Sequence, residues 1–196
     1  MKKLLLILLF TVMGWKLFGP EAVVELGPGI MAKEAPRQKS LINSEKITFD
    51  SYQITPLTSF DIKAKVLSKK SYSLGRESDL SPVDFALGWQ KMSDEKVLNN
   101  IDISQSGRWY RWRVESFPIP RREIETQSAN MHIIPANDLV ERMLDQVKQG
   151  QVIAMTGYLV RVDADDGWHW QSSLTRDDTG AHACEVIYVE QLDIVH

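Results

Sequence analysis

One amphipathic helix, predicted over residues 137–150, interrupts a chain that otherwise has the composition of short β-strands. Its sequence is NDLVERMLDQVKQG, in which Asn137 or Asp138 caps the first turn and Asp138 with Glu141 fits a capping box. Gly150 supplies the C-terminal stop. The apolar stripe of this helix consists of Leu139, Val140, Met143, Leu144 and Val147.

Strand patterns lie on both sides of this helix. Before it come KITFDSYQITPL, FDIKAKVLSKKSYSL and GRWYRWRVESFPI, and REIETQSANMHIIPA is predicted to be the partner of the last of these. After it come QVIAMTGYLVRVD, GWHWQSSL and ACEVIYVEQLDIV, the last apolar on both faces as in a central strand. Residues 78–102 predict short helices or turns instead.

The predicted fold class is therefore mainly β with one inserted α-helix. A helix, a turn glycine and a strand interrupted by Gly157 resemble the corresponding part of an OB-like barrel, where a glycine bends the strand. An α+β sheet and a β-sandwich remain open as alternatives.

The first residues, MKKLLLILLFTVMGWKLFGP, predict a membrane segment. Two lysines precede an apolar run from Leu4 to Trp15, Lys16 follows it, and Gly19-Pro20 ends the predicted helix. We expect an uncleaved anchor over residues 1–19, with a cleaved signal peptide as the alternative. Because the two lysines precede the run, the N-terminus is expected inside and the body outside the cytoplasm, in a single-pass protein of the inner membrane.

Composition places a linker over residues 20–45 and a β-rich domain over 46–196. Residues 20–45 hold three prolines and two glycines without sustained periodicity. The whole chain has 196 residues, of which 43% are hydrophobic and 25% charged, which is typical of a globular domain with a short appendage. Its net charge of -3 gives no overall attraction to nucleic acid, so nucleic acid is not an expected partner.

A stretch rich in arginine and aromatic residues is the predicted binding face. In GRWYRWRVESFPI, the residues Trp109, Arg111, Trp112 and Arg113 combine stacking surface with positive charge. The expected partner is a protein of the cell envelope, and an anionic polymer is the alternative ligand. A half-buried strand whose arginines pair with neighbouring glutamates is the structural alternative.

The only cysteine, Cys184, raises the possibility of chemistry. It lies two residues after His182, and His169 lies across the predicted hairpin, so the three could form an activated thiolate or a metal site. The alternative is a buried core cysteine, since Cys184 leads into an apolar strand. His132, beside apolar residues, is expected to be a structural histidine.

A short tripeptide resembles the catalytic loop of the pepsin and retroviral protease families. It is Asp178-Thr179-Gly180, but polar residues precede it, and it fits a β-turn better. No phosphate-binding loop, dinucleotide fingerprint or zinc-protease motif is present, so we expect no cofactor. The sequence thus favours a non-catalytic binding or scaffold module of an envelope assembly. The alternative is a hydrolase, transferase or metal-binding domain that uses Cys184 with His182 or His169.

Overall fold

The computed structural model describes residues 22–42, 44–175 and 184–196 and is mainly β, with 46% of these residues in strands. The strands are β1 (Arg37–Ser40), β2 (Ile47–Phe49), β3 (Tyr52–Ser71), β4 (Val83–Gly88), β5 (Asp102–Ser106), β6 (Trp109–Arg113), β7 (Ser128–Pro135), β8 (Val152–Ala164), β9 (His169–Gln171) and β10 (Glu185–Ile194). The helices are α2 (Arg76–Leu80), the 3-10 helix η1 (Gln90–Ser93), α3 (Glu95–Leu98), α4 (Arg121–Thr126) and α5 (Asp138–Gln146).

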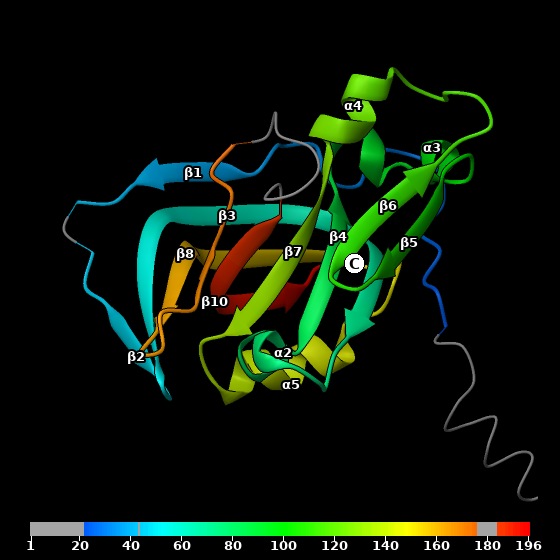
Figure 1. The fold of residues 1–196 in the computed structure, drawn as a ribbon. Helices are drawn as coiled ribbons and strands as arrows, with labels where there is room; N and C mark the ends of the chain where they lie inside the picture. Colours follow the sequence, from blue (N-terminus) through cyan, green and yellow to red (C-terminus); the bar gives the residue numbers. More distant parts are fainter. Residues whose placement is uncertain (1–21, 43, 176–183) are drawn as a thin grey trace, which may run out of the picture.

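Five strands of a mixed eight-stranded sheet pair in a closed ring (Figure 1). The order around the ring is β3, β4, β7, β10, β8 and back to β3. Only β7 and β10 run parallel; the other ring pairs are antiparallel. The remaining three strands of this sheet are not part of the ring: β1 and β2 pair with β3, and β9 pairs with β8.

The length of β3 allows the ring to close. This 20-residue strand pairs with β8 from Tyr52 to Lys65 and with β4 from Lys65 to Ser71. Register shifts at Pro56/Thr58 and at Val66/Ser68 bend it between the two partners. Such irregularities increase strand twist and re-aim a strand, so one long strand can border both sides of the ring.

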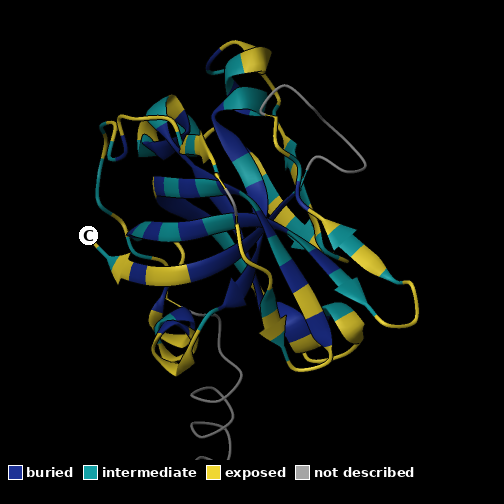
Figure 2. Ribbon diagram, turned by 90° about the vertical axis from the view of Figure 1, so that its left-hand side faces the viewer, coloured by how far each residue is buried: buried dark blue, intermediate teal, exposed yellow. Residues whose placement is uncertain are grey.

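The main hydrophobic core lies inside the ring. Alternate residues of each ring strand point inward, and Figure 2 shows the buried residues concentrated on these strands. Helix α5 packs on this core through Val140, Leu144 and Val147. The side chain of Asn137 caps α5 by accepting hydrogen bonds from the amides of Leu139 and Val140, so the predicted helix and its cap are confirmed.

Gly157 marks a close approach between two backbones. A Cβ atom at this position would lie 2.0 Å from the carbonyl oxygen of Tyr188 on β10. A glycine is therefore required where β8 crosses close to β10, next to the register shift between Val189 and Gln191.

Three local predictions are wrong. Residues 121–126 form helix α4 rather than a strand, because the chain turns into a helix at Pro120 and the strand begins only at Ser128. The partner of β6 is β5, in a separate two-stranded sheet. The short helix expected after Ser81 is also replaced, since Val83–Gly88 is the fully buried strand β4.

The segment expected as a linker lies against the domain over its described part. Residues 22–36 are here called the strap. The backbone amides of Leu26 and Gly27 in the strap donate to the carboxylate of Glu95, the first residue of α3, both at 2.7 Å. The strap then continues into β1, which pairs with β3. The predicted anchor, residues 1–19, falls outside the described residues. Among the residues that are described, no helix is both long and apolar enough to cross a membrane.

Candidate binding face

The β5–β6 hairpin carries the arginine and tryptophan residues that the sequence singled out. In β6, exposed and half-buried residues alternate, so Trp109, Arg111 and Arg113 face outward. Tyr110 and Trp112 face inward and pack against a second core cluster that includes Leu67 of β3 and Ile124 of α4. The structure therefore places three of the four predicted contact residues on one outward surface and turns Trp112 to the opposite side.

The two outward arginines contact other described residues at the protein surface. Arg111 Nη1 donates to Ser106 Oγ at 2.8 Å, and Arg113 Nη2 lies 3.2 Å from Asp102 Oδ2. The Arg113 and Asp102 side chains are 85% and 77% exposed, and ion pairs this open to water contribute little free energy. Both guanidinium groups can therefore exchange these contacts for a ligand, and Trp109, 41% exposed, lies beside them.

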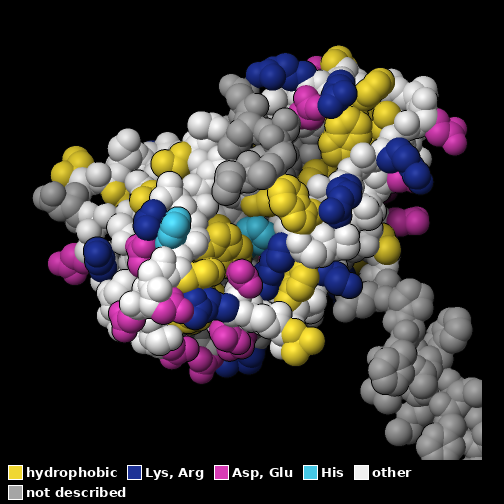
Figure 3. Space-filling model, viewed as in Figure 1, with side chains coloured by type: hydrophobic (Ala, Val, Ile, Leu, Met, Phe, Trp, Pro, Cys, Tyr) yellow, Lys and Arg dark blue, Asp and Glu magenta, His cyan; other side chains and the backbone are white. Residues whose placement is uncertain are grey.

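A shallow groove of about 620 Å³ runs along the edge of this surface. Its aromatic part is Trp112 and Phe117, whose ring centroids are 6.2 Å apart, and Phe117 is 54% exposed. The Arg121 guanidinium lies 5.9 Å from the Trp112 ring centroid, within cation–π range. Figure 3 shows Lys or Arg and hydrophobic side chains gathered over the hairpin and α4.

A buried polar network fixes the turn of the hairpin to the ring. Arg108, in the left-handed region at φ 68°, places Nη1 at 2.7 Å from Oδ1 of Asp84, a carboxylate with 0% exposure. The same oxygen lies 2.9 Å from Nδ1 of His132. Within the described part of the chain, Asp84 Oδ2 and Arg108 Nη2 have no hydrogen-bond partner.

Aromatic rings enclose this network. The Arg108 guanidinium carbon lies 4.0 Å from the ring centroid of Tyr72, and the Tyr72 hydroxyl accepts a hydrogen bond from the Arg108 amide at 3.0 Å. Burial raises the pKa of Tyr72 above its usual value. On the other side, the His132 and Trp170 rings lie 4.7 Å apart. Sequence reasoning counted Arg108 only among the arginines of the arginine-rich stretch and missed Asp84 and the contact between the two. It treated His132 as structural, which agrees with its burial here.

Of the predicted cysteine–histidine site, His169 and Cys184 lie within the described residues. His182 and the tripeptide Asp178-Thr179-Gly180 lie outside the described residues. His169 pairs with Asp163 on β8, whereas Cys184 accepts a backbone hydrogen bond from Ser173, four residues further along the chain. The Cys184 side chain is half-buried, with Sγ 4.0 Å from Nδ2 of Asn130.

Cys184 instead lies near the buried network. Asn130 and His132 are two residues apart on β7 and thus share one face of that strand. Over the described ranges, no group of three or more His, Cys, Asp or Glu residues could hold a metal ion. The arrangement offers a half-buried thiol beside an amide, with an Asp84–His132 contact on the same face.

Comparison with family models, with curated proteins and with solved structures found no match. Any assignment of function therefore depends on the physical features of the chain itself.

Proposed function

We propose that this chain is a membrane-anchored, non-catalytic binding or scaffold module of a bacterial envelope assembly. In this proposal residues 1–19 span the inner membrane once, with the N-terminus inside, and the β domain lies outside the cytoplasm. The support is the order of charge and apolarity at the N-terminus, two lysines and then an apolar run. The contact face is the outward surface of the β5–β6 hairpin.

We further propose that the ring is an OB-like barrel. In chain order its strands are β3, β4, β7, β8 and β10, and the helix α5 lies between the third and fourth of them. OB folds bind their ligands on the face of the second and third strands and on adjoining loops. Here those strands are β4 and β7, and the hairpin is inserted between them in the chain, which supports a binding role for it.

The expected occupant is an acidic protein surface in the envelope. The observation that carries this proposal is the outward set of Trp109, Arg111 and Arg113 on a hairpin held by a buried network. Tryptophan and arginine dominate the energetics of protein interfaces, and arginine recognises carboxylates with two parallel hydrogen bonds. An anionic polymer is the competing ligand, and nucleic acid is not expected for a chain of net charge -3.

Charge reversal on the hairpin tests this function. A photo-crosslinking amino acid at position 109 of the full chain should trap a discrete envelope protein in living cells. The double variant R111E/R113E should abolish that adduct, because its acidic surface repels an acidic partner. The matched control is R142E/K148E, which changes the net charge equally on α5 and the residues after it and should leave the adduct intact. Equal adduct yield in both double variants would refute the proposed face.

Thiol chemistry is the second candidate function. The observation in its favour is the position of Cys184 beside Asn130, on the side of β7 that also carries the Asp84–His132 contact. A nucleophilic Cys184 should react with iodoacetamide in the folded chain faster than a free cysteine at neutral pH, and H132A should slow it. A thiol that reacts only after unfolding would exclude this candidate and leave the binding role.

A further inference from the structure

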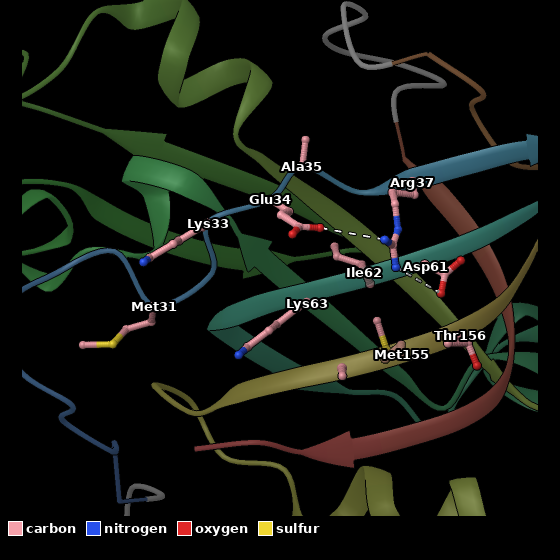
Figure 4. A pocket seen from close by; sticks show the side chains of 11 residues that line it. Met31, Lys33, Glu34, Ala35, Arg37, Asp61, Ile62, Lys63, Met155 and Thr156 are labelled. Atoms are coloured by element: carbon pink, nitrogen blue, oxygen red, sulfur yellow. Dashed lines mark ion pairs between the residues drawn. The ribbon is translucent and has the colours of Figure 1, made fainter.

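A pocket of about 550 Å³ opens between the strap and the strands β3 and β8 (Figure 4). Its floor includes Ile62 and Met155, which pair across the two strands and are 5% and 1% exposed. Its wall includes Arg37 and the strap residues Met31, Lys33, Glu34 and Ala35. The pocket is thus apolar at its base, and its volume lies in the range of small-molecule sites.

The wall of the pocket is fixed at both of its ends. On one side, the amides of Met31 and Ala32 donate to Ser93 Oγ at 3.1 and 3.0 Å, and the carbonyl of Ala32 accepts from the Gln90 amide at 2.6 Å. On the other side, Arg37 begins β1 and pairs with Asp61 of β3. Because both ends are anchored, the pocket exists before any ligand arrives, which lowers the entropic cost of binding.

Some charged side chains of the pocket form ion pairs with one another, and two lysines do not. Arg37 lies between two carboxylates, 3.9 Å from Glu34 and 4.0 Å from Asp61. Lys33 and Lys63 make no ion pair with any residue that the structure describes. Figure 4 shows these two lysines reaching from opposite walls, with both ammonium groups on the same side of the pocket and away from Arg37.

We propose that this pocket binds a phosphate ester, with the phosphate between Lys33 and Lys63 and the organic part against Met31 and Met155. Two ammonium groups complement the double negative charge of a phosphate monoester, and lysine binds phosphate as a point charge. The partly apolar lining accepts a carbon skeleton, which free phosphate lacks. The ester is either a soluble metabolite or the headgroup of an anionic lipid. This site shares no residue with the hairpin, so its test is independent of the test of the proposed function.

Methionine methyl resonances report directly on this pocket. The full chain, labelled with 13C at the methionine methyl groups and held in a neutral detergent, is titrated with glycerol 3-phosphate and separately with dihexanoyl phosphatidic acid. The signals of Met31 and Met155, assigned by M31L and M155L, should shift together and saturate. Shifts with both probes identify a soluble ester, whereas shifts with the lipid alone identify a headgroup. No shift with either probe up to about 10 mM, the limit of weak binding, overturns the proposal.

Charge removal separates a specific site from general attraction. The double variant K33Q/K63Q should weaken binding at least about tenfold. The control K39Q removes an exposed lysine of β1 that does not line the pocket, and its affinity should equal that of the wild type. Unchanged affinity in K33Q/K63Q, or an equal loss in K39Q, would contradict the assignment. All three lysines changed here are exposed, so the variants are expected to fold.

Discussion

Two arginines of the β5–β6 hairpin each form an ion pair with an aspartate, but one aspartate is buried and the other is exposed. Arg108 reaches Asp84, which has 0% exposure, whereas Arg113 reaches Asp102 with both side chains mostly in water. The distances, 2.7 and 3.2 Å, differ little. Burial, rather than proximity, therefore decides the role of each pair: the first positions the hairpin, and the second leaves a guanidinium exposed to water and able to exchange its contact.

The physical reason is the cost of removing a charge from water. A buried carboxylate that loses its cation, or a buried guanidinium that loses its anion, keeps its desolvation penalty and gains nothing in return. An exposed pair loses only a weak attraction, because water and salt screen both charges. Single substitutions at the two aspartates should therefore have very different effects.

The substitution D84A should destabilise the fold most. This variant leaves the partly buried Arg108 guanidinium without its carboxylate, and it removes the contact with His132. We expect the free energy of unfolding to fall by about 3 kcal/mol or more, as is usual when one partner of a buried ion pair is deleted. Denaturant unfolding of the full chain, followed by tryptophan fluorescence, measures it.

The matched control is D102A, which removes the exposed aspartate of the other pair. It should change the free energy of unfolding by less than about 1 kcal/mol. If the two variants lose similar stability, the buried network does not hold the hairpin and the contrast between the two pairs fails.

A smaller effect is expected on the inward face of the hairpin at alkaline pH. The hydroxyl of Tyr110 is enclosed and hydrogen-bonded to Ser128 Oγ at 3.1 Å, and burial raises its pKa to about 12. The folded chain thus holds this proton more tightly than the unfolded chain, whose tyrosine titrates near pH 10. This difference in pKa stabilises the folded chain relative to the unfolded chain. The contribution to the free energy of unfolding is fully present below about pH 10 and is lost as the pH rises through 12, and its total is about 2 to 3 kcal/mol.

The variant Y110F isolates this contribution. At neutral pH it should lose only about 1 kcal/mol, the net value of one hydrogen bond. Between pH 10 and 12, the stability of the wild type should fall relative to that of Y110F. Parallel stability curves for the two proteins over that range would show that the Tyr110 hydroxyl is not enclosed.

Local sequence patterns predicted those elements whose cap or hydrophobic periodicity lies within the element's own residues. Helix α5 has its cap at Asn137 and a periodic stripe, and β6 alternates between polar and aromatic residues. Strand β4 was missed because all six of its residues are buried, so it shows no alternation, and Asp84 interrupts its apolar run. Helix α4 was mistaken for a strand because its six residues are too few to display a helical period.

The geometry of the candidate face could be predicted only in part, for the same reason. Alternation in β6 places Arg111 and Arg113 together, and this follows from the sequence alone. The contact of Arg108 with Asp84 joins two elements separated in the chain, and no periodicity encodes it. The docking of the strap is equally hidden, because it uses backbone amides on the side chains of Ser93 and Glu95.

The smallest expected effect is the coupling between Arg113 and Asp102. A double-mutant cycle with R113A, D102A and their combination should give an interaction energy of less than about 0.5 kcal/mol, because both groups remain hydrated in the folded chain. The equivalent cycle for Arg108 and Asp84 should give a value several times larger. A strong coupling on the outward face would mean that Arg113 is committed to its own chain. The partner would then have to displace a stable ion pair, and Arg111 and Trp109 would be left to carry the contact.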